Sequence, residues 1–236
     1  PDPASPDLRR ARIAWCVYDW ANSAFPTVIV TFVFAAYFAT AVAADTATGT
    51  AQWSRALAIS GLLIAILSPV LGAIADRSGR RKPWLAGCSA VTVLGAALLW
   101  YARPDADYAI YALVCFALAN IAFEVGQVFY NAMLPTLVPR ERMGRLSGWG
   151  WGLGYAGGLS CLVIALFAFV QGDPPLLGLD KTSAEHVRVI GPMVAIWFAV
   201  FCVPLFLFVP DAPASGLRPL AAARDVQDEL ARANLP

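Results

Sequence analysis

The chain has 236 residues, of which 59% are hydrophobic and only 14% are charged. Soluble domains average roughly 45–50% apolar and about 25% charged residues, and a soluble fold of this size has too much surface to hide so many apolar side chains. The 17 lysines and arginines nearly balance the 16 aspartates and glutamates, so no overall positive field attracts nucleic acid. The composition excludes an ordinary cytoplasmic enzyme, a disordered chain and a nucleic-acid-binding domain, and it predicts a membrane protein.

Long apolar segments alternate along the chain with short breaks that carry charges, prolines or glycines. A bilayer core about 30 Å thick needs roughly 20 apolar residues in a helix, and no segment shows the period-two alternation of a transmembrane β-strand. The first segment is too long for a signal peptide and lacks its cleavage site. We therefore predict an all-α polytopic membrane protein with helices near 18–43, 54–75, 84–101, 108–132, 146–170 and 188–209.

Lysine and arginine are distributed unevenly between the predicted loops. Thirteen of the 17 lie before the first helix, after the second, after the fourth or after the sixth, and four lie on the opposite side. Because cytoplasmic loops carry such an excess, we expect both ends of the chain in the cytoplasm and the protein in a cell (inner) membrane. The predicted organisation is a cytoplasmic flank over 1–12, a six-helix membrane domain over 13–209, and a cytoplasmic linker with a short amphipathic helix over 210–236.

Polar residues lie inside the first predicted helix, toward its cytoplasmic end. Asp19, Asn22 and Ser23 share one helix face, and Pro26, one turn later, removes a backbone donor and can bend the helix. Polar groups inside a membrane normally face the bundle interior or a water-filled cavity. We expect Asp19 to coordinate a substrate ammonium group, with capping of the helix as the alternative.

The loop between the second and third predicted helices reads Gly72-Ala-Ile-Ala-Asp76-Arg77-Ser-Gly79-Arg80-Arg81-Lys82. Its first glycine permits close helix approach, its second allows a tight turn, and its aspartate can pair with the cations that follow. We interpret the loop as a conformational latch, with a simple basic loop that sets the topology as the alternative. The latch residues are Gly72, Asp76, Arg77, Gly79, Arg80, Arg81 and Lys82.

The fourth predicted helix carries the longest polar stripe. Its members, spaced four, three and four residues apart, are Asn120, Glu124, Gln127 and Asn131. This spacing places them on one helix face. A single asparagine is equally consistent with an interhelical hydrogen bond, worth about 0.6 kcal/mol on average. Together with the stripe in the first helix, however, the pattern predicts a cavity that binds substrate or protons.

Glu124 is the acid within this stripe. Keeping a glutamate neutral at pH 7 costs about 3.7 kcal/mol, whereas an ionised side chain at mid-membrane costs about 2.5–3.5 kcal/mol. Because these costs nearly match, modest changes in hydration can move the proton, and we expect Glu124 to bind a coupling proton or a substrate amino group. The alternative is a static pair with a cation from elsewhere, since no lysine or arginine lies in the central part of the predicted helices.

The fifth predicted helix begins with a run of glycines. Gly150, Gly154 and Gly158 recur at a spacing of four, which lets helix backbones touch, so we interpret them as helix-packing residues. Residues 152–157 also match Gly-x-Gly-x-x-Gly, but no strand precedes them and no acid follows at the required distance. The match therefore does not indicate a dinucleotide site.

The sequence shows no pattern typical of catalysis or metal binding. The five cysteines are scattered singly, and the single histidine, His186, lies in a predicted outer loop. We expect the cysteines to be small buried hydrophobic residues, and we predict no metal, no cofactor and no enzymatic activity.

The loop over 72–82 resembles the signature loop of the major facilitator superfamily, Gly-x-x-x-Asp-Arg-x-Gly-Arg-Arg-Lys. The stretches 18–25, 129–132 and 141–148 look like the unknown major facilitator family, which is related to the fungal vacuolar amino-acid effluxer of autophagy. The resemblance runs from about Ala14 to Val209. It implies the N-terminal half of a twelve-span transporter, built as two inverted three-helix repeats, with the first and fourth helices lining the cavity and the latch bracing one half against the other.

The expected function is secondary active transport of a small polar solute by alternating access, and the resemblance implies that this solute is an amino acid. The alternative is a non-transporting membrane receptor or assembly subunit built on a half-transporter fold. The expected partners are a small-molecule substrate, the lipid bilayer and a second six-helix half in the same polypeptide, but no nucleic acid.

Overall fold

The computed structural model describes residues 6–78, 80–174 and 176–211, with backbone only over 74–78. Over these residues the secondary structure is helical, without strands. The units long and apolar enough to cross a membrane are Pro6–Val42, Thr46–Ala73, Lys82–Tyr101, Ala106–Leu137, Arg140–Val170 and Glu185–Phe208. The predicted all-α class and the six spans are therefore confirmed. The predicted amphipathic helix near the C-terminus lies outside the described residues.

Several spans are built from more than one helical segment. Span one, Pro6–Val42, consists of α1 (Pro6–Asn22), η1 (Phe25–Phe32), α2 (Phe34–Tyr37) and η2 (Phe38–Val42). The next spans contain α3 (Thr46–Ser78), α4 (Lys82–Leu98) with η3 (Leu99–Tyr101), and η4 (Ala106–Tyr108) followed by α5 (Ala109–Ala132) and α6 (Leu134–Leu137). The last two contain α7 (Arg140–Ile164) with η5 (Ala165–Val170), and α8 (Glu185–Arg188) with α9 (Ile190–Phe208), with η6 (Leu176–Gly178) in the loop between them.

The first helix begins about twelve residues earlier than predicted, inside the region expected to be a flank. Its first turns are charged, but Ala11, Ala14 and Trp15 are buried in the core, so packing extends the helix beyond its apolar stretch. Similarly, α7 begins at Arg140, directly after the extended Pro139. Hydropathy locates the part of a helix that crosses the membrane, whereas packing and proline decide where the helix begins.

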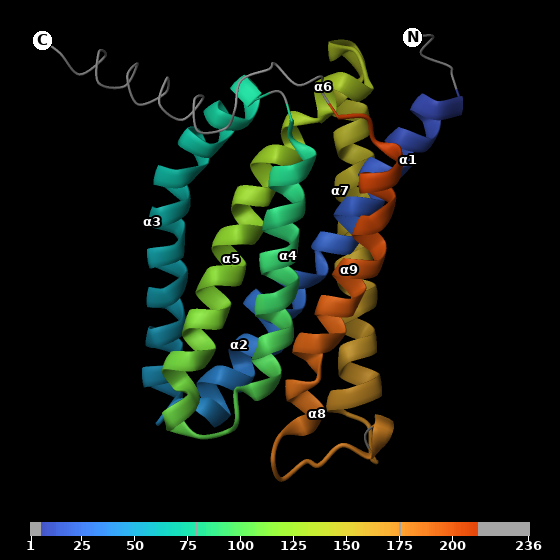
Figure 1. Ribbon diagram of the computed structural model, residues 1–236. Coiled ribbons are helices and arrows are strands. Elements are labelled where there is room, and N and C mark those ends of the chain that lie inside the picture. The colour runs from blue at the N-terminus through green and yellow to red at the C-terminus, as the bar shows by residue number, and fades with distance from the viewer. Residues whose placement is uncertain (1–5, 79, 175, 212–236) are drawn as a thin grey trace, which may run out of the picture.

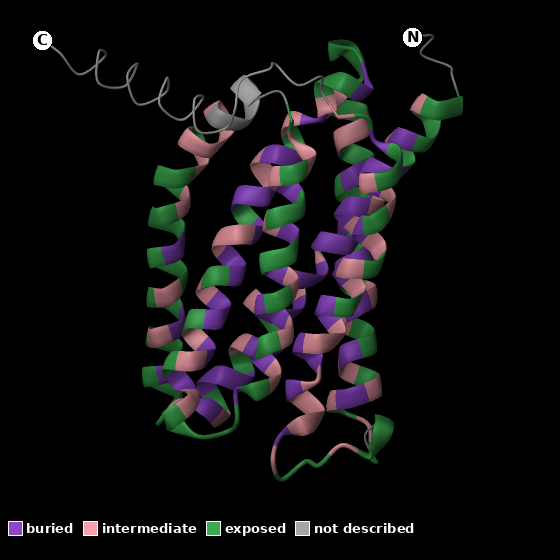
Figure 2. Cartoon of the chain, viewed as in Figure 1, coloured by how far each residue is buried: buried purple, intermediate pink, exposed green. Residues whose placement is uncertain are grey.

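The long helices stand side by side (Figure 1), with α6 at one end of the bundle and α8 at the other. We call these the α6 end and the α8 end. The helix α1 packs against α7 and α9, α5 packs against α3 and α4, and α4 also contacts α9. Figure 2 shows buried residues concentrated between the helices and a largely exposed α3. Span one and the span containing α5 are the most buried, so these two form the centre of the bundle.

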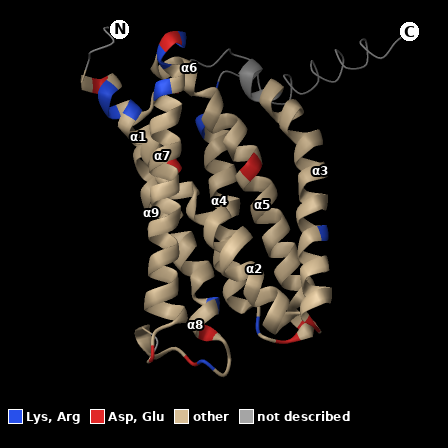
Figure 3. Ribbon diagram, turned by 180° about the vertical axis from the view of Figure 1, so that it is seen from behind, with Lys and Arg blue, Asp and Glu red and all other residues tan. Residues whose placement is uncertain are grey.

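Charged residues are concentrated toward the two ends of the bundle (Figure 3). The described cations at the α6 end are Arg9, Arg10, Arg12, Arg80, Arg81, Lys82, Arg140, Arg142 and Arg145. Arg103, Lys181 and Arg188 belong to the α8 end, and Arg55 lies on α3. The described cations before span one, after span two and after span four thus lie at one end of the fold.

Span one changes to π-helix at Phe25, directly before Pro26. Proline has no backbone N–H and its ring crowds the preceding turn, which disfavours an uninterrupted α-helix. The Thr31 hydroxyl donates to the Pro26 carbonyl oxygen at 2.9 Å, and Val33 N donates to Val28 O at 3.0 Å. These bonds span five residues. Since π-helical turns are rare and often occur at functional sites, this segment is a functional candidate on backbone geometry alone.

Two helix ends cap each other at the α6 end. The Asp211 carboxylate, just beyond α9, accepts from Arg81 N at 3.0 Å and from Lys82 N at 3.3 Å, where α4 begins. In return, the Lys82 ammonium group donates to the Phe206 carbonyl oxygen near the end of α9 at 3.0 Å. Acids are favourable at helix N-termini and cations at C-termini, so this exchange joins the end of α9 to the basic loop.

Candidate functional site

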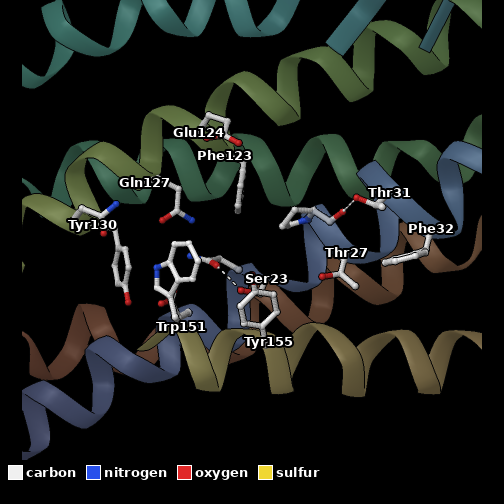
Figure 4. A pocket seen from close by; sticks show the side chains of 14 residues that line it. Ser23, Thr27, Thr31, Phe32, Phe123, Glu124, Gln127, Tyr130, Trp151 and Tyr155 are labelled. Atoms are coloured by element: carbon white, nitrogen blue, oxygen red, sulfur yellow. Dashed lines mark hydrogen bonds between the residues drawn. The ribbon is translucent and has the colours of Figure 1, made fainter. Parts of the chain in front are cut away.

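A cavity of about 500 Å³ opens between span one, α5 and α7. Small-molecule sites typically enclose about 300–1,000 Å³, so the cavity is large enough for a small solute. Its lining residues are Asp19, Asn22, Ser23, Pro26, Thr27, Thr31, Phe32, Phe123, Glu124, Gln127, Tyr130, Asn131, Trp151 and Tyr155. In Figure 4, side chains from all three elements surround one space.

The two polar stripes identified in the sequence meet in this cavity. Six of the seven predicted residues line it, namely Asp19, Asn22, Ser23, Glu124, Gln127 and Asn131. The seventh, Asn120, lies one turn closer to the α8 end, is only 4% exposed and is not among the lining residues. Helical periodicity predicts a common face, but it does not show where along that face the cavity ends.

The span-one side of the cavity holds a buried acid and a buried amide. Asp19 is 9% exposed and Asn22 only 1% exposed. Ser23 Oγ donates to Asn22 Oδ1 at 3.4 Å, whereas Asn22 Nδ2 has no hydrogen-bond partner within the described structure. A buried donor without a partner is costly. Because Asn22 lines the cavity, water or a bound solute can supply the missing acceptor.

A dense aromatic contact lies beside the cavity, toward the α6 end. Trp15 stacks on Tyr130 with ring centres 4.4 Å apart, and Tyr18 stacks on Tyr130 at 4.9 Å. The Tyr18 hydroxyl is 2.9 Å from Ser89 Oγ, which connects the contact to α4. These rings are buried, so they fix the relative positions of α1, α4 and α5 around Asp19.

The glycines of α7 lie directly against span one. A Cβ atom added at Gly150 would lie 2.9 Å from Asp19 Oδ2, and one added at Gly154 would lie 2.7 Å from Ser23 Oγ. At Gly158 the corresponding distance to Thr27 Oγ1 is 2.5 Å. The absence of side chains on this face allows the α7 backbone to approach the polar side chains of span one.

Seven lining residues escaped the sequence analysis: Thr27, Thr31, Phe32, Phe123, Tyr130, Trp151 and Tyr155. Trp151 and Tyr155 are four residues apart and contact each other edge to face at 6.1 Å between ring centres. Their four-residue spacing, next to the glycines of the same helix, is the sequence pattern that could have indicated a common position on the cavity wall. Without knowledge of which helix faces which, however, aromatic residues in a membrane span are equally typical of a lipid-facing surface.

The charge of the lining is entirely acidic. Asp19 and Glu124 are its ionisable carboxylates, and the fourteen described lining residues include no lysine, arginine or histidine. Neutral donors and acceptors come from Asn22, Gln127 and Asn131. Aromatic rings also border the space, and ring faces attract cations. This arrangement favours a proton or a solute carrying an ammonium group over an anion.

The predicted latch is described only in part. A Cβ added at Gly72 would lie 3.4 Å from Val128 Cγ1, so α3 approaches α5 closely there. The side chains of Asp76 and Arg77, and all of Gly79, lie outside the described residues. Arg81 and Lys82 take part in the contact with Asp211, and Arg80 is exposed.

Potential metal ligands are not clustered in the described part of the chain, which contains no group of three or more His, Cys, Asp or Glu side chains that could hold a metal ion. The five cysteines are free; four are buried and Cys88 is half-buried. His186 lies in α8 and is not among the residues that line the cavity.

The six-helix bundle and its cavity define a known class of membrane protein. The fold is similar to that of the xylose transporter XylE from E. coli in its inward-open conformation, with a TM-score of 0.57 at 14% identity. That likeness covers 97% of this chain and 56% of the XylE chain. The fold is therefore that of one portion of a major facilitator transporter, and the chain is an integral membrane protein.

Sequence comparison narrows the class to a family. Residues 54–228 match the family model described as "Vacuole effluxer Atg22 like", and the chain belongs to this family. It is 30% identical over 199 residues to the uncharacterized MFS-type transporter YxiO of Bacillus subtilis (strain 168), covering 83% of this chain and 46% of that protein. The chain thus spans about half the length of the relatives it matches.

Proposed function

We propose that the chain is one six-helix half of a secondary transporter, and that the whole polypeptide moves a small polar solute, an amino acid, by alternating access. The observation that carries this proposal is the cavity of about 500 Å³ between span one, α5 and α7. It combines two acids and three side-chain amides within a membrane-embedded bundle, where polar groups mark solute and ion pathways.

Within the proposed site, the acids bind the charged part of the cargo. Asp19 is buried beside the unpartnered amide of Asn22, which suits recognition of a solute with both donors and acceptors. Glu124 is exposed on the α5 side of the cavity, where it is accessible to a coupling proton or a substrate ammonium group. Gln127 and Asn131 supply neutral hydrogen bonds along the same helix.

The proposed cycle needs a second six-helix half in the same polypeptide. The cavity is bounded by three elements of this chain, and the wide exposure of α3 leaves an apolar surface for lipid or protein. The loop over 72–82 would brace the two halves and set the balance between inward- and outward-facing states. We place the α6 end, with its excess of arginine, in the cytoplasm of a cell (inner) membrane.

Counterflow of labelled amino acids into liposomes that contain the full polypeptide tests the proposal. We expect uptake against preloaded unlabelled solute, and Glu124→Gln is expected to lower its rate about tenfold or more, equivalent to about 1.4 kcal/mol. The matched control is Asp107→Asn, an exposed acid at the α8 end. A Glu124→Gln protein with wild-type rate and wild-type pH dependence would remove Glu124 from the proposed site.

The second candidate is a non-transporting receptor or assembly subunit, which the partial coverage of its relatives leaves open. Saturable binding of an amino acid without counterflow would favour it.

Asp76→Asn separates the latch from a simple basic loop, because only a latch predicts altered solvent accessibility of cysteines introduced at the two ends of the cavity. The proposal assigns no enzymatic activity.

A further inference from the structure

Two aromatic side chains of α7 follow directly after glycines that touch span one. A Cβ added at Gly150 would lie 2.9 Å from Asp19 Oδ2, and Gly154 touches the next turn of span one. Trp151 and Tyr155 are the next residues along the chain, about 100° further around the helix. The repeated glycine–aromatic pair therefore places a ring beside each contact, on the flank of α7 that borders the cavity.

A comparison with Trp149 shows which flank of α7 borders the cavity. Trp149 and Trp151 precede and follow Gly150, so they lie on opposite sides of the helix face that contacts span one. The two tryptophans are almost equally exposed, at 65% and 63%, but of the two only Trp151 lines the cavity. The place of Trp151 near Asp19 therefore does not rest on its exposure. A second six-helix half that covers the open side of the cavity would leave both residues within it.

The faces of the two α7 rings are available inside the cavity. Figure 4 shows both side chains projecting from α7 into this space. Trp151 and Tyr155 contact each other edge to face, with ring planes inclined by 69°. In the described part of the chain, neither has another ring contact or a side-chain hydrogen bond. By contrast, Tyr130 also lines the cavity but has Trp15 and Tyr18 stacked on it at 4.4 and 4.9 Å.

A ring face and a carboxylate can together bind a cation. The face of an aromatic ring attracts an ammonium group within about 6 Å of the ring centre, and the indole of tryptophan is the strongest such ring. Asp19 supplies the opposite charge, and the described lining residues include no lysine, arginine or histidine that would compete for it. A ring face needs no N–H group on the cation, whereas hydrogen bonds to Asn22 or Gln127 do. The pair therefore suits alkylated as well as primary ammonium groups.

We propose that Trp151 is a specificity-determining residue of the cavity, where its ring face and the Asp19 carboxylate together hold the ammonium group of the cargo. Tyr155 forms the adjoining side of this subsite. The cavity thereby selects a cationic end over an uncharged end of the same shape, and it accepts an ammonium nitrogen without hydrogen atoms. The inference deepens the proposed function and rests on it, because the cargo must bind in this cavity.

Binding of two probes of matched shape to the full polypeptide in detergent tests the assignment. Choline carries a trimethylammonium group, and 3,3-dimethylbutan-1-ol carries an uncharged tert-butyl group in its place. Calorimetry gives both dissociation constants, and we expect choline to bind about tenfold more tightly or better. In Trp151→Leu this preference is expected to fall about threefold or more, whereas Trp151→Phe, which retains a ring, keeps most of it. The matched control Trp149→Leu should leave the preference unchanged.

The preference is a ratio within each variant, so a general loss of packing that weakens both probes cancels. The proposal is overturned if Trp151→Leu keeps the full preference, or if Trp149→Leu lowers it equally. Choline that binds no more tightly than the alcohol to the unaltered protein also overturns it. Calorimetry does not depend on transport. A Trp151-dependent preference for choline, without counterflow of any amino acid, would therefore contradict the proposed function and leave the ammonium subsite standing.

Discussion

Trp15 and Tyr130 exchange hydrogen bonds as well as stacking their rings. Trp15 Nε1 donates to the Tyr130 carbonyl oxygen at 3.2 Å, and the Tyr130 hydroxyl donates to the Trp15 carbonyl oxygen at 3.0 Å. The ring planes are inclined by only 8°. One residue belongs to α1 and the other to α5, so this pair joins two walls of the cavity at its α6 end.

Breaking one of these bonds is expected to weaken the fold measurably. Tyr130→Phe removes the hydroxyl that donates to the buried Trp15 carbonyl oxygen, and such a hydrogen bond contributes about 0.5–1.5 kcal/mol to the free energy of unfolding. The measurement is denaturant unfolding of the purified protein in detergent. Tyr111→Phe is the matched control, because the Tyr111 hydroxyl also donates to a backbone carbonyl, Leu98 O at 2.9 Å, but at an exposed position. Equal destabilisation by both substitutions would contradict a special role for the pair.

The glycine face of α7 is expected to tolerate a methyl group at one position and not at another. A Cβ added at Gly154 would meet Ser23 Oγ at 2.7 Å, whereas one added at Gly152 meets nothing within 4 Å. Alanine is favoured over glycine in a helix by up to about 1 kcal/mol. Gly152→Ala should therefore maintain or raise the thermal unfolding midpoint, and Gly154→Ala should lower it. The same direction of change in both variants would refute the close contact.

The reciprocal cap between α4 and α9 is expected to contribute more than an exposed ion pair. Asp211→Ala removes the acceptor of Arg81 N and Lys82 N, and loss of such a cap costs about 0.5–2 kcal/mol. Asp173→Ala breaks the exposed contact between Asp173 and Lys181, 3.2 Å apart, where pairs contribute about 0.2–1 kcal/mol. The thermal unfolding midpoints of both variants provide the comparison. A larger loss of stability in Asp173→Ala than in Asp211→Ala would contradict the expected contribution of the cap.

The loop before α8 is expected to keep its structure across the physiological pH range. Hydrogen bonds from Thr182 and Ser183 lower the pKa of Asp180 from its ordinary value of 3.8 to about 2. Because the folded pKa is depressed, this stabilisation is fully present above about pH 4 and is lost as the pH falls toward 2. Titration of the Asp180 carboxyl carbon by NMR checks this directly. A midpoint near 4 would show that the hydrogen bonds from Thr182 and Ser183 do not form in solution.

Helical periodicity predicted much of the fold, but it predicted some of the residues that line the cavity and missed others. The spacing from Glu124 to Asn131 predicts a shared face on any α-helix, and those residues do line one cavity. Thr31 was missed because span one becomes π-helical after Pro26, which shifts the positions that share a face. Trp151 and Tyr155 were missed because the neighbours of α7 depend on long-range packing, which no local pattern encodes.

The Asp19 carboxylate lies directly against the glycine backbone of α7, so its position depends on the orientation of that helix. With only hydrogen atoms between the α7 backbone and the Asp19 carboxylate, there is no flexible side chain to absorb a displacement. A rotation of α7 about its own axis would replace Gly150 by a neighbouring tryptophan, Trp149 or Trp151, against α1 and would push the acid out of place. The orientation of the fifth span and the position of the buried acid of the first are therefore linked by direct contact.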